Sequence, residues 1–118
     1  MGLLSNYYYT ILTESIISVS GKATLNTNMF SLSGARTVYE LRIDGEIVDS
    51  YEHGTFSKSG SLFAVLEQNN KKRSIRVDVS PGLFTIKYKL LIDEAEVCLT
   101  KISEAELKSL WHKRAIST

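Results

Sequence analysis

Few side chains of this sequence could take part in acid–base or nucleophilic chemistry at neutral pH. His53 directly follows Glu52 near the end of an alternating apolar segment, and a neighbouring carboxylate can orient an imidazole. Adjacent residues of a strand point to opposite faces, so the two side chains converge only if the strand has already ended. We therefore interpret His53 as a solvated loop residue rather than a general base.

The second histidine and the lone cysteine do not indicate a catalytic centre either. His112 lies among Lys108, Lys113 and Arg114, and a basic surface suits neither zinc nor a general base. Cys98 has no basic neighbour in sequence to activate its thiol, so we expect a core or half-buried position. The histidines and the cysteine lack the paired spacings of zinc sites, and the seven glycines form no phosphate-binding loop. The sequence predicts no enzyme, no metal and no cofactor.

Two polar clusters remain as candidates for binding. Lys71-Lys72-Arg73 follows Asn69-Asn70 in an expected hairpin loop, where it would contact phosphate or an acidic protein surface, or simply keep the turn solvated. We favour the solvated turn. Tyr7, Tyr8 and Tyr9 could supply stacking surface for a sugar or a base. On a strand Tyr7 and Tyr9 share one face, so one set is expected in the core and the other at the rim.

Length and composition indicate one domain over residues 1–118. Lys and Arg number 14 against 13 Asp and Glu, a net charge of +1 that points to neither nucleic acid nor an anionic membrane. A single cysteine favours a reducing compartment. No apolar run approaches the roughly 18 residues of a spanning helix, and the N-terminal residues lack the pattern of a secretion signal. We expect a soluble cytoplasmic protein.

Alternation of apolar and polar residues is clearest late in the chain. Ile75, Val77 and Val79 alternate with polar residues, and a second alternating run covers 84–92. Between them, Ser80-Pro81-Gly82 is typical of a tight turn. The pattern predicts two paired strands, each with one buried face.

A second hairpin is predicted around Asp44-Gly45, a dipeptide typical of hairpin turns. A two-residue loop would place Glu40 opposite Asp49, and like charges across a strand pair are unfavourable. A three-residue loop ending at Gly45 pairs Arg42 with Glu46 instead. We favour the three-residue loop.

Weaker patterns fill the rest of the chain and complete an all-β prediction. The further strands are expected at about Tyr7–Val19, Lys22–Leu32, Ser61–Glu67 and Glu94–Lys101, with breaks at Ser20-Gly21, Ser33-Gly34, His53–Gly60, Asn69-Asn70 and Asp93-Glu94. About seven or eight evenly spaced strands without intervening helices predict an antiparallel β-sandwich or an open barrel.

The C-terminal residues predict a short helix. A capping-box pattern at 103–106 marks its start, and the helix is expected at about 104–114. Leu107, Leu110 and Trp111 share one face of it. This apolar face either packs on an edge or open end of the chain's own sheets, which we favour, or docks on a protein partner.

Part of the sequence resembles the Fas apoptotic inhibitory molecule family. The resemblance spans about residues 36–97 and is carried by Tyr39-x-Leu41-x-Ile43-Asp44-Gly45, by Tyr51-Glu52-His53-Gly54-Thr55, and by Lys72-x-x-Ile75-x-Val77-Asp78 leading through Gly82 and Phe84 to Tyr88-x-Leu90-x-Ile92. It implies a non-enzymatic β-sandwich module of the cytosol that acts through protein contacts in cell-survival signalling and in protection against protein aggregation.

The absence of catalytic patterns and the complete β pattern together predict a non-catalytic protein-interaction module. A protein partner is expected at an exposed sheet edge or at the apolar helix face, and edge strands also make self-association plausible. The alternative is a sandwich or barrel that binds a small ligand, a carbohydrate or a lipid, with Tyr7, Tyr8, Tyr9 and Trp111 as aromatic platforms.

Overall fold

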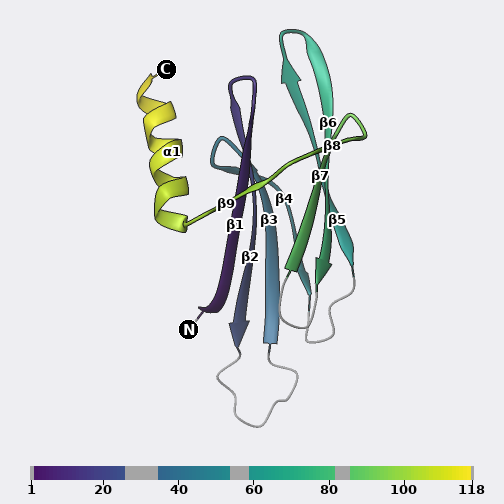
Figure 1. The fold of residues 1–118 in the computed structure, drawn as a ribbon, viewed down its shortest axis with the longest axis vertical. Coiled ribbons are helices and arrows are strands. Elements are labelled where there is room, and N and C mark those ends of the chain that lie inside the picture. The colour runs from purple at the N-terminus through teal and green to yellow at the C-terminus, as the bar shows by residue number, and fades with distance from the viewer. Residues whose placement is uncertain (1, 26–34, 54–58, 82–85, 118) are drawn as a thin grey trace.

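The computed structural model describes residues 2–25, 35–53, 59–81 and 86–117. In this part of the chain, nine strands and one helix follow one another (Figure 1). They are β1 (Gly2–Leu12), β2 (Ser15–Leu25), β3 (Ala35–Ile43), β4 (Glu46–His53), β5 (Gly60–Gln68), β6 (Lys71–Pro81), β7 (Ile86–Ile92), β8 (Ala95–Val97), β9 (Thr100–Ile102) and α1 (Glu104–Ser117).

The strands form two antiparallel sheets whose inner faces enclose one core. The first sheet has the order β4-β3-β2-β1-β9 and the second β5-β6-β7-β8. Both sheets contribute to one cluster of buried side chains: Ile17, Val19, Tyr39, Leu41, Leu62, Ile75, Val77, Val79, Leu90 and Ile92. The predicted all-β sandwich is therefore confirmed, and neither sheet closes into a barrel.

The alternation at β6 and β7 predicts the buried faces correctly. Ile75, Val77 and Val79 are buried, and Leu90 and Ile92 of β7 join them. Each apolar side chain of β6 removed from water contributes roughly 1.5–3 kcal/mol, which makes this strand a large part of the core. The turn predicted at Ser80-Pro81-Gly82 is wrong at its first two residues, because Ser80 and Pro81 belong to β6 and pair with Lys87 and Ile86; Gly82 lies outside the described residues.

The N-terminal prediction of one strand over Tyr7–Val19 is wrong. The chain turns at Thr13-Glu14, where Thr13 has a φ of 56°. The predicted break at Ser20-Gly21 is also wrong, since β2 runs through it. A Cβ at Gly21 would lie 2.3 Å from the hydroxyl of Tyr88, so this glycine makes room for a side chain rather than for a turn. The predicted strand Lys22–Leu32 is described only to Leu25, and the break at Ser33-Gly34 lies outside the described residues.

The hairpin between β3 and β4 has a two-residue turn, so the favoured three-residue loop is wrong. Asp44 and Gly45 both have positive φ, 52° and 90°, as a type I′ turn requires. Ile43 therefore faces Glu46. The register then shifts at Val48, a β-bulge. Because of the bulge, Glu40 lies opposite Ser50 instead of Asp49, and the unfavourable pair of carboxylates does not form.

The bulge also turns Asp49 towards the second sheet. Its carboxylate accepts hydrogen bonds from the backbone N–H of Phe63, at 2.8 Å, and from that of Ser50, at 2.9 Å. Phe63 belongs to β5, the edge strand of the second sheet, and Asp49 to β4, the edge strand of the first. The side chain thus joins the two sheets along one side of the sandwich.

Replacing Asp49 by Ala is expected to lower the free energy of unfolding by about 1 kcal/mol, because the Phe63 N–H loses its acceptor at a partly exposed position. Urea denaturation followed by circular dichroism measures the change. Glu46→Ala removes an exposed carboxylate from the same strand and serves as the matched control. Equal midpoints for the two variants would contradict the bridging role of Asp49.

The two remaining hairpins turn where the sequence predicts breaks. Asn69-Asn70 and Asp93-Glu94 have positive φ at all four residues. Lys71-Lys72-Arg73 is nevertheless not part of a loop, since β6 begins at Lys71 and pairs it with Gln68. The predicted loop at these basic residues is therefore corrected to the start of a strand.

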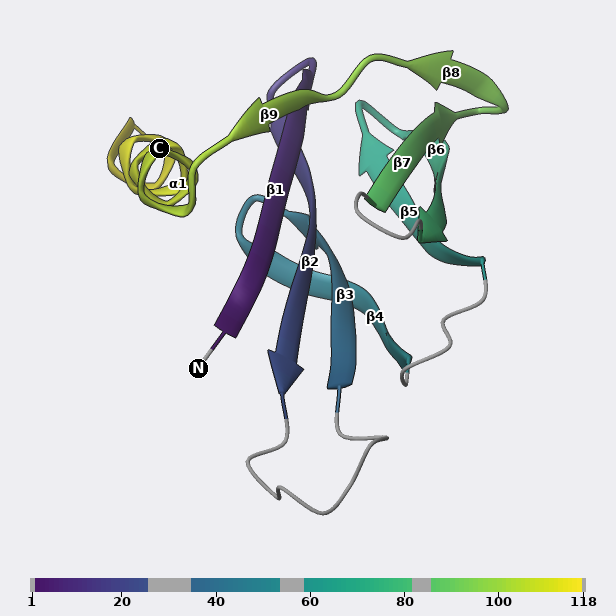
Figure 2. The ribbon, with the colours of Figure 1, turned by 60° about the horizontal axis from the view of Figure 1, so that its bottom comes forward.

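The strand predicted at Glu94–Lys101 is divided between the two sheets. β8 pairs with β7 of the second sheet, whereas β9 pairs with β1 of the first. Figure 2 shows the chain crossing from one sheet to the other between them. The crossing delivers α1 to the outer side of the first sheet (Figure 1).

Helix α1 begins at the predicted cap. The Ser103 hydroxyl accepts a hydrogen bond from the Glu106 N–H at 3.2 Å and donates one to the Glu106 carboxylate at 3.0 Å. The helix extends to Ser117, beyond the expected end near residue 114. Within the described residues, no helix has the length and apolar character needed to cross a membrane.

Candidate functional site

The apolar face of α1 is directed at the chain's own first sheet. Leu107 is 1% exposed, and Leu110 and Trp111 are half-buried. The Trp111 ring lies over Gly45, whose added Cβ would be 3.4 Å from it, and the Arg42 guanidinium carbon is 5.6 Å from the ring centroid. The helix thus lies over the outer face of the first sheet, rather than at an edge or an open end.

A cleft of about 180 Å³ remains between α1 and this sheet, which we call the helix cleft. Three hydroxyl-bearing residues line it, namely Tyr7, Ser18 and Ser20. Trp111 and Leu107 line the helix side. Both serines are buried, because they occupy the outward positions of β2 that α1 and its neighbours cover.

Charged groups surround the hydroxyls of the helix cleft. The Glu104 carboxylate accepts a hydrogen bond from the Tyr7 hydroxyl at 2.9 Å and lies 2.9 Å from Lys108 Nζ. The hydrogen bond from Lys108, and then that from Tyr7, hold the pKa of Glu104 below its usual value. Arg42 donates to the Gly45 carbonyl at 3.0 Å and lies 3.5 Å from Glu40.

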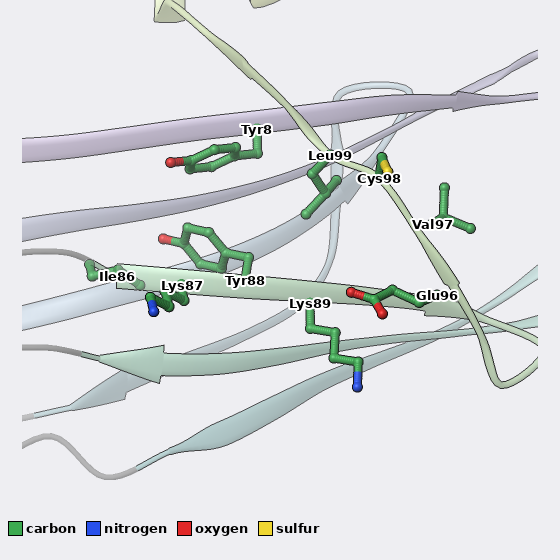
Figure 3. Close-up of a pocket in the computed structure, with 9 residues that line it drawn as sticks. All are labelled: Tyr8, Ile86, Lys87, Tyr88, Lys89, Glu96, Val97, Cys98 and Leu99. Atoms are coloured by element: carbon green, nitrogen blue, oxygen red, sulfur yellow. The ribbon is translucent and has the colours of Figure 1, made fainter.

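A second hollow, of about 330 Å³, opens beside the core (Figure 3). Tyr8 of the first sheet and Tyr88 of the second line it, with ring centroids 5.3 Å apart. The Tyr88 ring also meets Tyr39, which stacks on Tyr51 at 5.0 Å. These four residues form what we call the tyrosine cluster. Burial raises the pKa of Tyr39 and Tyr88, and raises that of Tyr51 to about 12.

The tyrosines proposed from the sequence as aromatic platforms do not meet in one site. Tyr8 packs against the core, whereas Tyr7 lies in the helix cleft on the other face of β1. Tyr9 shares the face of Tyr7 and is partly buried. Trp111 does join Tyr7 in the cleft, but Gly45 and Arg42 contact its ring, so it is no open stacking surface.

The residues considered for chemistry are dispersed. Glu52 is exposed on β4, and His112 is exposed on α1. The expected loop position of His53 is wrong, because its backbone ends β4 and pairs with Thr37, while its side chain lies outside the described part. Cys98 is exposed, and the expected buried position is wrong, because the chain leaves one sheet for the other at this point. Among the described residues, no group of three metal-binding side chains comes together.

Among the described residues, four of the five large apolar side chains that are exposed lie on the edge strands β4 and β5, and the sequence patterns did not single them out. Ile47, Val48, Phe63 and Val65 are 49%, 44%, 60% and 67% exposed. Asp49 contacts Phe63, and an added Cβ at Gly60 would lie 2.8 Å from the Tyr51 hydroxyl, so the two edge strands lie beside each other at these points. We call these four residues the edge strip.

The edge strip lacks lysine, the side chain that most often protects an edge strand, although β4 carries the bulge at Val48. β4 and β5 carry the acidic residues Glu46, Asp49, Glu52 and Glu67 and no Lys or Arg. By contrast, residues 86–89 of β7 extend past the short β8 and carry two exposed lysines, Lys87 and Lys89. Lysine on an edge discourages pairing with another chain. The free part of β7 thus carries exposed lysines, whereas the edge strands β4 and β5 carry exposed apolar and acidic side chains.

Alternation predicts that β5 is a strand but not which side of it faces water. Residues 61–66 are mostly apolar in both phases, so the exposure of Phe63 and Val65 has no signal in the strand itself.

The fold and the site define a class of protein, a two-sheet β-sandwich with exposed apolar residues and no lysine on the edge strands β4 and β5. Comparison with family models, curated proteins and solved structures finds no match.

Proposed function

We propose that this chain is a non-catalytic protein-interaction module that binds an extended segment of another protein along the edge strip. The observation that carries the proposal is the exposure of Ile47, Val48, Phe63 and Val65 on two adjacent edge strands without lysines. Contiguous exposed apolar surface is typical of interaction sites. The resemblance to the Fas apoptotic inhibitory molecule family supports a role through protein contacts, in cell-survival or stress-protection signalling in the cytoplasm.

The backbone of β5 suits the addition of a further strand. In an antiparallel ladder, a residue directs both its N–H and its C=O either towards the neighbouring strand or away from it. The Phe63 N–H points to Asp49 and therefore away from β6, and Val65, two residues on, has the same orientation. Because Asp49 of β4 already accepts the hydrogen bond of the Phe63 N–H, an added strand would hydrogen-bond to Val65 beyond this contact, while the Phe63 and Val65 side chains contact its apolar residues.

Charge favours a foreign segment with basic residues over a second copy of this chain. An edge-to-edge dimer would bring the acidic residues of β4 and β5 close to one another, and like charges across a strand pair are unfavourable. A segment in which Lys or Arg alternates with apolar residues complements both the carboxylates and the edge strip. The proposed partner is therefore an extended basic and apolar segment.

A ten-residue peptide of alternating lysine and valine tests the proposal, by fluorescence anisotropy against the full chain. Val65→Lys places a lysine on the unguarded edge and is expected to weaken binding by about tenfold or more. Ile11→Lys changes an exposed apolar residue elsewhere, 55% exposed against 67% for Val65, and is expected to leave binding unchanged. A peptide of alternating glutamate and valine is expected to bind more weakly than the lysine peptide.

Two results would overturn the proposal. Equal binding of the lysine peptide to the parent chain and to Val65→Lys would place recognition elsewhere. A dimer seen by sedimentation equilibrium in the parent chain, and lost in Val65→Lys, would replace the foreign segment by a second copy.

A further inference from the structure

We propose that the helix cleft binds a small oxyanion, a carboxylate or a phosphate. The cleft runs along β2 beneath α1, with Glu104 and Tyr7 towards one end and Trp111 over Gly45 at the other. Its volume of about 180 Å³ corresponds to roughly six water molecules. A small ligand therefore fits, whereas a protein segment does not.

The floor of the cleft is polar where a docked helix would ordinarily meet apolar residues. Ser18 and Ser20, 2% and 7% exposed, take the outward positions of β2 beneath α1. Larger apolar residues at these two positions would fill the cleft and bury more apolar area. The sequence instead keeps two hydroxyls and an unfilled volume there.

The charges that line the cleft include one more cation than carboxylates, although Lys22 also helps to lower the pKa of Glu104. Three cations, Lys22, Arg42 and Lys108, face two carboxylates, Glu40 and Glu104, which leaves a net charge of +1. Lys108 is paired with Glu104 and Arg42 with Glu40. Among the described residues, Lys22 makes no close ion pair of its own.

Trp111, which lines the cleft, carries a hydrogen-bond donor that lacks an acceptor. The Trp111 indole N–H is buried and has no partner within the described part of the chain. A buried donor without an acceptor is unfavourable, so an acceptor atom placed in the cleft would stabilise it. Ser18 and Ser20 can donate to the same ligand. A positive charge together with free donors selects an oxyanion; a sugar suits the cleft less, because Arg42 already packs on the Trp111 ring.

Trp111 is the only tryptophan of the chain, so its indole N–H gives one unambiguous signal in a ¹H–¹⁵N spectrum. We expect sodium acetate or sodium phosphate, titrated into the full ¹⁵N-labelled chain, to move this signal along a saturating curve. Sodium chloride at equal ionic strength is expected not to do so. If acetate alone saturates the signal, the cleft is a carboxylate site. If phosphate alone saturates it, the cleft is a phosphate site.

Lys22→Gln tests the charge. Lys22 is exposed, so the variant is expected to melt like the parent chain and to bind the anion about fivefold more weakly. Lys87→Gln, on the other sheet, is the matched control and keeps the parent affinity. The proposal is overturned if chloride gives the same curve, if glucose saturates the signal and the anions do not, or if Lys22→Gln leaves the affinity unchanged.

Discussion

Leu90→Asp is expected to leave the chain without a cooperative unfolding transition at 25 °C. Leu90 is 1% exposed in the middle of β7, with Val77 opposite it on β6 and Val97 on β8. A carboxylate at this position would have no partner and no water, which costs several kcal/mol. A domain of this size has a total stability of roughly 5–15 kcal/mol, so one such change removes most or all of it.

Lys87→Asp is the matched control for this substitution. Lys87 lies on the same strand, is exposed, and faces Ser80 across the pair. Its replacement is expected to change the free energy of unfolding by no more than about 0.5 kcal/mol. Circular dichroism during heating and urea denaturation gives both results. A parent-like melt of Leu90→Asp would show that β7 turns its other face to the core.

The fold class follows from the sequence because half-buried strands dominate it. In β6 the inward positions from Ile75 to Val79 are all apolar, so alternation identifies both the strand and its buried side. The N-terminal hairpin is different, because Thr13-Glu14 is not typical of a turn and its position is fixed by pairing. Ser20-Gly21 looks like a turn, yet Gly21 is required by the aromatic rings packed against it. Local patterns cannot separate these two uses of glycine.

The candidate sites depend on contacts that no local pattern encodes. Tyr7 and Glu104, which lie 97 residues apart, meet because β9 pairs Ile102 with Tyr7 and so starts α1 beside β1. The helix cleft is therefore a product of the crossing between sheets. The edge strip likewise depends on which strands lie at the edges and on the bulge at Val48. Sequence reasoning favoured packing of the apolar helix face on the chain's own sheets, but placed it at an edge or open end rather than on the outer face of the first sheet.

Alkaline pH is expected to unfold the domain through the tyrosine cluster. Tyrosine in an unfolded chain loses its proton near pH 10, whereas burial raises the pKa of Tyr39 and Tyr88, and raises that of Tyr51 to about 12. Below pH 10 both states keep these protons, and the contribution to stability is fully present. Above pH 10 the unfolded chain releases protons that the folded chain retains, so the free energy of unfolding falls as the pH rises towards about 12.

Tyr88→Phe isolates this effect, because it removes a buried hydroxyl of the cluster and keeps the ring. That hydroxyl is buried without a hydrogen-bond partner in the described residues, so at neutral pH its loss is expected to be neutral or stabilising by up to about 1 kcal/mol. Urea midpoints between about pH 9 and pH 12 should then fall less steeply than in the parent chain. Tyr9→Phe, outside the cluster on the outer face of β1, should keep the parent slope. If the urea midpoint of Tyr88→Phe falls with pH as steeply as that of the parent chain, groups other than the tyrosine cluster cause the alkaline unfolding.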